Sequence, residues 1–212
     1  MRLKNVKGAN EIIINGKYYL ANAYQYKGKW NEVFDNDNKE LHIEIGMGKG
    51  NFIINNALKY PNINFIGIEK FDSVIVRAIQ KSNDLDINNL KIVRMDAINI
   101  EDVFDKEIDT LYLNFSDPWP KDRHAKRRLT SDIFLAKYEN IFKKDKHIIM
   151  KTDNIDLFNF SLECFERNNY KILNITNDLA NENIDNIKTE YEERFMDKGI
   201  KINRVEVKKD KV

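Results

Sequence analysis

The residues best suited to chemistry lie in one stretch, LNFSDPWPKDRHAKRR, at residues 113–128. An apolar, β-prone run ends there in a single carboxylate, Asp117, and the tripeptide Pro-Trp-Pro follows at 118–120. Each proline fixes its own φ and biases the preceding residue toward extended geometry. We therefore expect a strand that presents Asp117 on a stiff turn. The alternative interpretation is a capped strand end followed by a solvated charged loop.

A cluster of cations follows this turn. The basic residues between positions 121 and 128 are Lys121, Arg123, Lys126, Arg127 and Arg128. Such a run can bind phosphate groups. The formal net charge of the chain is only +1, so any attraction to nucleic acid has to come from this local cluster.

A glycine-rich turn lies far upstream, in the sequence EIGMGKG at residues 44–50. Its glycines permit positive φ and let a ligand approach the backbone. The spacing is GxGxG rather than GxGxxG, and a tight strand-to-helix turn explains it equally well. Glu69 ends the next predicted strand, where an acid can accept both ribose hydroxyls, and Asp96 ends the third, beside an adenine edge. The combination predicts an adenosine-bearing ligand, either a nicotinamide cofactor or S-adenosylmethionine.

Apolar periodicity predicts alternating strands and helices after residue 40. We expect strands at 41–45, 64–68, 90–95, 110–115, 147–150, 170–175 and 202–207, and helices at 51–60, 72–81, 101–104, 130–142 and 157–165. Strict alternation is typical of a parallel sheet covered on both faces, which binds ligands beyond the carboxyl ends of its strands. The acids expected at that edge are Glu44, Glu69, Asp96, Asp117 and Asp153.

The length and composition of the chain limit the classes of fold and of binding site that it can form. Its 212 residues, 42% of them apolar, suit one α/β domain at 41–212, preceded by a polar arm at 1–40 that packs on the domain or on a partner. Cys164 is the only cysteine, so no intrachain disulfide is possible, and the histidines lack metal-ligand spacing. We find neither a signal peptide nor an apolar run that could cross a membrane, so a cytoplasmic location without a membrane partner is expected.

Further motifs resemble one enzyme family. EIGMGKG, the strand end at Glu69, and Asp96 are similar to the cofactor motifs of class I S-adenosylmethionine-dependent methyltransferases. FSDPWPKDRHAKRR, KTD at 151–153 and TEYEERF at 189–195 are narrower, and they resemble the bacterial tRNA (guanine-N7-)-methyltransferase family. The resemblance covers about residues 41–207. It implies a doubly wound, mostly parallel, seven-stranded Rossmann-like methyltransferase sheet with helices on both faces.

The resemblance also implies site residues and partners. The residues expected to contact the cofactor S-adenosylmethionine are Glu44, Gly46, Gly48, Gly50, Glu69, Asp96 and Asp117. Those expected to contact the substrate are Lys121, Asp153, Thr189, Glu190, Tyr191 and Glu192. Those expected to contact tRNA are Arg123, His124, Ala125, Lys126, Arg127 and Arg128. No metal is expected. Two departures from the family pattern, Ser116 where many members have proline and Asp122 within the basic run, remove no group that the chemistry needs.

The implied reaction is methyl transfer to N7 of a guanine in the variable loop of tRNA, at position 46 in tRNA numbering. Guanine N7 has an in-plane lone pair and carries no proton, so alignment matters and a general base is unnecessary. We expect Asp117 to stabilise the positive charge that develops on the purine, with Asp153 as the alternative. Other interpretations stay open: methylation of another RNA guanine, a dinucleotide-dependent oxidoreductase, or an RNA-binding protein without activity. A monomer and a homodimer are both compatible with the sequence.

Overall fold

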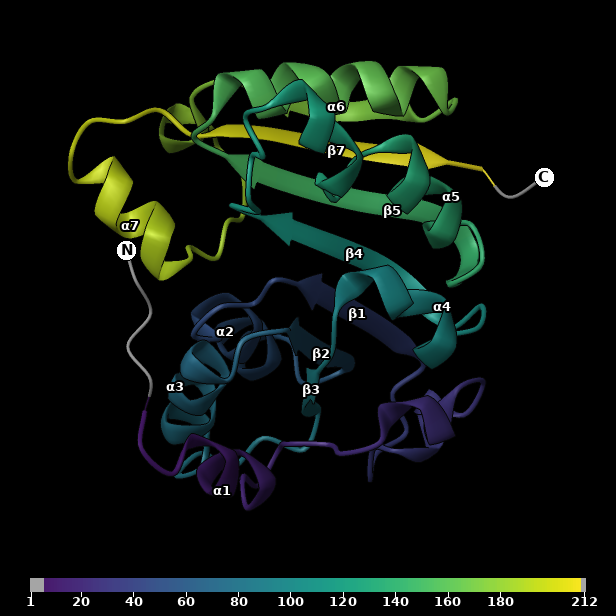
Figure 1. Ribbon diagram of the computed structural model, residues 1–212, viewed down its shortest axis with the longest axis vertical. Coiled ribbons are helices and arrows are strands. Elements are labelled where there is room, and N and C mark those ends of the chain that lie inside the picture. Colours follow the sequence, from purple (N-terminus) through teal and green to yellow (C-terminus); the bar gives the residue numbers. More distant parts are fainter. Residues whose placement is uncertain (1–5, 211–212) are drawn as a thin grey trace.

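Seven strands form a single sheet in the order β3-β2-β1-β4-β5-β7-β6 in the computed structural model, which describes residues 6–210 (Figure 1). The strands are β1 Glu40–Ile45, β2 Ile63–Glu69, β3 Leu90–Arg94, β4 Ile108–Asn114, β5 Phe142–Thr152, β6 Lys171–Thr176 and β7 Asn203–Lys209. β1 to β5 are parallel to one another, and β7 runs antiparallel to both of its neighbours. This arrangement confirms the predicted doubly wound, mostly parallel sheet.

Helices cover both faces of the sheet (Figure 1). One face carries α1 Ala9–Ile14, α2 Asn51–Lys59 and α3 Asp72–Ser82, and the other carries α4 Ile100–Val103, α5 Asp132–Tyr138 and α6 Ile155–Arg167. Because strand side chains alternate between the two faces, a separate buried apolar cluster forms under each helical layer. α7 Glu190–Met196 lies apart from both layers, beside the carboxyl ends of the central strands. Short 3-10 helices occur at Ala23–Tyr26, Trp30–Glu32, Ala97–Asn99, Asp122–Arg127 and Leu179–Asn181.

The predicted helix over 130–142 is wrong at both ends. α5 begins only at Asp132, because the Thr130 hydroxyl shares a 2.7 Å hydrogen bond with a serine of α6 instead of capping the helix. At the other end, Phe142 already belongs to β5 and pairs with β4. The predicted strand at 147–150 misses the first half of β5, because the charged residues at 143–146 break the apolar pattern.

The N-terminal arm packs against β3 and α4. Tyr19 forms an isolated bridge with Ile92 on β3. Trp30 is fully buried, where its indole N–H donates to the Val103 carbonyl at 2.8 Å and its ring stacks on Phe104 at 5.0 Å between centroids. The arm therefore contributes core side chains, while the domain boundary at residue 40 stays a prediction.

Candidate active site

The carboxyl ends of the five parallel strands meet at one edge of the sheet. Across that edge the acids follow the strand order: Asp96 after β3, Glu69 at the end of β2, Glu44 in β1, Asp117 after β4 and Asp153 after β5. Ligands of parallel α/β sheets bind at this position. The β3-β2-β1 half of the edge carries the glycine loop, and the β4-β5 half carries the proline-containing turn.

The glycine loop, residues 46–50, connects β1 to α2. Its three glycines have positive φ: 78° at Gly46, 55° at Gly48 and 80° at Gly50. A Cβ at Gly46 or Gly48 would point into open space, whereas one at Gly50 would lie 2.9 Å from the Ala78 Cβ on α3. Gly50 therefore lets the loop pack closely on α3, and the other two glycines leave room for a ligand against the backbone.

Glu69 holds this loop in place. It is 9% exposed, and its Oε2 accepts a hydrogen bond from the Gly48 N–H at 3.1 Å. Its Oε1 accepts from the Lys70 and Phe71 N–H groups at 2.7 and 3.1 Å. On the neighbouring strand end, Asp96 Oδ2 bonds to the Lys70 ammonium at 2.6 Å, and this bond lowers the pKa of Asp96 below its ordinary value. The two acids thus occupy adjacent positions at the same edge.

Glu44 is the most deeply buried of the five acids. Its Oε1 accepts a hydrogen bond from the Asn114 amide at 2.8 Å, but Glu44 Oε2 and Asn114 Oδ1 are buried without a partner among residues 6–210. Burial raises the pKa of Glu44 to about 7, and the Asn114 bond and the Lys151 charge oppose this increase. Buried acceptors normally have donors, so this pair suits a cationic group of a ligand.

The turn at residues 115–120 presents Asp117. Phe115 and Trp119 have φ values of 51° and 43°, which residues other than glycine rarely adopt. Two sets of contacts hold this conformation: the Phe115 N–H donates to the Lys151 carbonyl at 2.8 Å, and the Arg128 guanidinium donates to two carbonyls of the turn at 2.9 and 3.1 Å. Asp117 itself is exposed and has no hydrogen bond or ion pair with any described residue. The turn therefore presents an unpaired carboxylate.

Three cations beside the turn face solvent. Lys121, Arg123 and Lys126 are exposed, and within the described chain their side chains have no ion-pair or hydrogen-bond partner. Ala125 between them contributes its carbonyl, which accepts the Arg128 N–H at 3.0 Å. The exposed cations are therefore available to bind phosphates.

The remaining members of the basic segment pack on the turn. The Arg127 guanidinium lies over the Trp119 ring at 4.9 Å, and His124 meets the same ring edge-on at 5.7 Å between centroids. Arg128 is buried and bonds to the turn carbonyls described above. The predicted RNA-contacting set thus contains three exposed cations without side-chain partners, Arg127, which is exposed and also packs on Trp119, and Arg128, which is buried against the turn.

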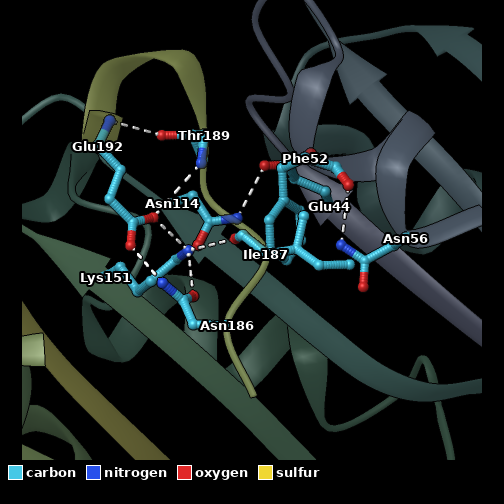
Figure 2. A network of polar contacts seen from close by, with 9 residues as sticks. All are labelled: Glu44, Phe52, Asn56, Asn114, Lys151, Asn186, Ile187, Thr189 and Glu192. Carbon is cyan, nitrogen blue, oxygen red and sulfur yellow. Dashed lines mark hydrogen bonds and ion pairs between the residues drawn. The ribbon is translucent and has the colours of Figure 1, made fainter. Parts of the chain in front are cut away.

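Four residues predicted to contact substrate lie at the N-cap and in the first turn of α7, and all four have partners within the protein. The Thr189 hydroxyl accepts a hydrogen bond from the Glu192 N–H at 2.9 Å, in a capping box. Glu192 is fully buried and forms an ion pair of 2.6 Å with the Lys151 ammonium at the end of β5 (Figure 2). Glu190 forms ion pairs with Lys49 of the glycine loop, at 2.9 Å, and with a lysine of α3.

Tyr191, in the same turn of α7, contacts the proline-containing turn. Its ring stacks on Phe195 at 4.1 Å and contacts Phe115 at 4.8 Å between centroids. Its hydroxyl lies 3.5 Å from Asp153 Oδ2 and is a long hydrogen-bond donor to it. Tyr191 and Asp153 are thereby brought together, as predicted for two substrate-contacting residues, although their role stays a prediction.

Sequence reasoning does not single out Lys151, which lies at the end of β5 and is buried against Glu192 of α7. The signal that could have found it is a lysine at the end of an apolar strand, in the KTD motif. Long charged side chains are rarely buried unless they are paired.

Sequence comparisons find relatives along nearly the whole chain. A family model described as "Putative methyltransferase" matches residues 38–205. A tRNA (guanine-N(7)-)-methyltransferase of Lachnoclostridium phytofermentans is 51% identical over 208 residues, which is 97% of each chain. The enzyme of the same name from Bacillus subtilis is 48% identical over 98% of each chain. This chain belongs to the tRNA (guanine-N(7)-)-methyltransferase family.

The fold of this tRNA (guanine-N(7)-)-methyltransferase family member is also found among solved structures. The 16S rRNA methyltransferase KamB matches with a TM-score of 0.62 and 9% identity, over 87% of this chain and 94% of that one. At this identity the likeness shows the fold alone, and it confirms the methyltransferase architecture. No helix within residues 6–210 is long and apolar enough to cross a membrane. In the same part of the chain, no group of three or more His, Cys, Asp or Glu side chains could hold a metal ion.

Proposed function

We propose that this protein transfers a methyl group from S-adenosylmethionine to N7 of a guanine in the variable loop of tRNA. The observation that carries the proposal is the convergence of two features on one sheet edge. The unpartnered acceptors of Glu44 and Asn114 lie beside the open glycine loop, and the unpaired Asp117 lies beside exposed cations. Relatives named tRNA (guanine-N(7)-)-methyltransferase support the choice of substrate.

The residues of the β3-β2-β1 half, together with Asn114 at the end of β4, fit S-adenosylmethionine. Glu44 Oε2 and Asn114 Oδ1 offer acceptors for its ammonium group, and the glycine loop leaves space beside the backbone. The Glu69 and Asp96 carboxylates lie where ribose hydroxyls and an adenine edge are bound in such sheets. When bound, S-adenosylmethionine supplies a methyl group activated by a sulfonium sulfur. A nicotinamide cofactor is the weaker alternative, since the loop has GxGxG rather than GxGxxG spacing.

The chemical role of the protein is alignment and charge stabilisation. N7 needs no base, so the two reactants have only to be held in line, which can supply roughly 7–11 kcal/mol. Positive charge develops on the purine as the methyl group arrives, and a preorganised carboxylate stabilises it. Asp117 is our candidate because its carboxylate is unpaired and its turn is held from two sides. We propose Asp153, which accepts a long hydrogen bond from Tyr191, as the acceptor for the base edge.

The exposed cations bind the phosphate groups of the RNA. Lys121, Arg123 and Lys126 are available for phosphates next to the Asp117 turn. The target base has to leave its stacked position, which costs on the order of a few kcal/mol. Contacts of these side chains with the tRNA backbone offset that cost. A cytoplasmic location is part of this proposal, because it would bring the protein together with tRNA.

Labelled methyl transfer to tRNA tests this function. Unmodified tRNA made by transcription is incubated with labelled S-adenosylmethionine, digested and analysed as nucleosides. We expect 7-methylguanosine, and none when the variable-loop guanine of the transcript is replaced by adenosine. Label in another nucleoside, or equal labelling of the two transcripts, would contradict the proposal.

A further inference from the structure

Lys151 is a buried cation whose side-chain hydrogen bonds all go to one segment. It is 2% exposed, and its ammonium lies 2.6 Å from Glu192 Oε2, 3.0 Å from Asn186 Oδ1 and 3.1 Å from the Ile187 carbonyl oxygen (Figure 2). Its three donors are thus matched by three acceptors. Burial lowers the pKa of Lys151, and the Glu192 charge opposes this decrease. All three acceptors belong to residues 186–192, which include the first turn of α7.

The main-chain carbonyl of Lys151 contacts the turn that presents Asp117. The Lys151 carbonyl accepts the hydrogen bond from the Phe115 N–H, at the start of the turn that presents Asp117. In the sheet, Lys151 pairs with Asn114, whose side chain bonds to Glu44. Lys151 therefore contacts both the Asp117 turn and residues 186–192. Its strand, β5, also lies next to β4, which carries the Asn114 side chain that bonds to Glu44.

Fold stability alone gives little reason for this ion pair. A buried pair is often no more stabilising than apolar residues of the same volume, because both charges lose their hydration. Residues 183–189 form no helix or strand of their own, so side-chain contacts decide where they lie on the sheet. Precise placement of this segment matters if it contacts the substrate, since small displacements of reactants slow a reaction strongly.

We propose that Lys151 is a positioning residue for methyl transfer, which fixes residues 186–192 relative to the turn of Asp117. It acts through its neighbours and does not touch the reacting atoms. The inference rests on the function proposed above for the nature of the substrate. Loss of Lys151 should therefore slow transfer to tRNA far more than it weakens binding of S-adenosylmethionine.

The test compares two buried lysines of the same strand. Lys146, near the middle of β5, is 7% exposed and pairs with Glu139, which also bonds to Lys209. Lys151→Met and Lys146→Met each remove one buried charge. Initial rates at saturating S-adenosylmethionine give kcat and KM for unmodified tRNA, and calorimetry gives the affinity for S-adenosylmethionine. We expect kcat/KM to fall about 100-fold in Lys151→Met, mostly in kcat, and to stay near the wild-type value in Lys146→Met.

A double variant separates positioning from folding. Lys151→Met/Glu192→Gln removes both charges of the ion pair and keeps an amide oxygen for the Asn186 and Thr189 donors, so its Tm and its affinity for S-adenosylmethionine should be near the wild-type values. We expect kcat/KM to stay about 100-fold low in this variant. Recovery of activity together with stability would overturn the proposal, because the pair would then serve the fold only.

A milder substitution covers the case in which these variants do not fold. Asn186→Ala removes one of the three acceptors and the Asn186 hydrogen bond to Glu192, and it should lower kcat about tenfold with a small loss of Tm. An unchanged kcat would also overturn the proposal. Failure of the proposed function gives a different result: the wild-type protein itself would not methylate tRNA.

Discussion

The Glu190 carboxylate, on α7, forms an ion pair of 2.9 Å with the ammonium of Lys49 in the glycine loop. The same carboxylate pairs with Lys81 on α3. A helix from the C-terminal part of the chain is thereby connected to the glycine loop, so the parts of the site proposed to bind substrate and cofactor are in direct contact.

Glu190→Gln should weaken binding of S-adenosylmethionine modestly. All three charged groups are partly exposed, so the loss should be about two- to fivefold at low salt. Because salt screens such pairs, the difference from wild type should nearly vanish at about 1 M salt. Calorimetric titration at both salt concentrations measures it. Glu193→Gln, in the same turn but exposed and without a described side-chain partner, is the matched control and should bind as wild type does.

The pH dependence of stability should report the buried Glu44. Burial raises the pKa of Glu44 to about 7 from an ordinary value of 4.5, so the folded state binds this proton more tightly than the unfolded state. The contribution of Glu44 to stability is therefore most favourable below pH 4.5 and is lost as the pH rises through 7. Relative to Glu44→Gln, the ligand-free protein should lose roughly 3 kcal/mol over this range. Denaturant unfolding across the same range measures the difference.

Binding of S-adenosylmethionine should show the opposite trend. The ionised form of Glu44 is the one that suits an ammonium group, so affinity should fall as the pH drops below about 7. Glu44→Gln should bind more weakly and without this pH dependence. Parallel profiles for the two proteins would show that Glu44 does not contact the charged end of the ligand.

Loss of an exposed cation of the basic segment should change the salt dependence of tRNA binding, whereas loss of the buried Arg128 should change the stability of the fold. Each of Arg123→Ala and Lys126→Ala should reduce the slope of log affinity for tRNA against log salt by about 0.7–0.9, since each side chain is exposed. Arg128→Ala should instead lower the Tm, because its guanidinium is buried against the turn. Arg77→Ala, an exposed cation of α3, is the control and should leave the slope unchanged. A slope insensitive to Arg123 and Lys126 would remove this segment from the RNA interface.

Asp117→Asn should slow methyl transfer while leaving the fold intact. The side chain is exposed, so the Tm should hardly change. Loss of a preorganised charge opposite the developing cation should lower kcat about 100-fold or more. Single-turnover rates at saturating S-adenosylmethionine measure this step. Asp122→Asn removes an acid five residues away and should keep the wild-type rate; equal rates for wild type and Asp117→Asn would assign the catalytic role elsewhere.

The sheet and its acidic edge were predictable from local pattern. Glu44, Glu69 and Asp96 each lie at or just beyond the end of an apolar strand, and parallel strands bring such ends to one edge. The side-chain partners were not predictable in the same way. Lys151 and Glu192 are 41 residues apart, and neither the KTD motif nor the TEYEERF motif indicates that these two side chains form an ion pair.

The roles of the TEYEERF and basic motifs show the same limit. Thr189 and Glu192 have the spacing of a helix cap as well as of a substrate contact, and the structure shows that the cap is formed. A run of cations predicts positive charge but not which side chains point to solvent. The sequence therefore does not show that Arg128 is buried while Arg123 is exposed. In each case a contact distant in sequence decides which way the side chain points.

The most direct test of the central claim, that the acidic strand ends hold S-adenosylmethionine, is a calorimetric titration with that compound and with NAD. We predict that the wild-type protein binds S-adenosylmethionine and not NAD, and that Asp96→Ala loses about tenfold or more in affinity. Binding of NAD, or unchanged binding of S-adenosylmethionine to Asp96→Ala, would contradict it.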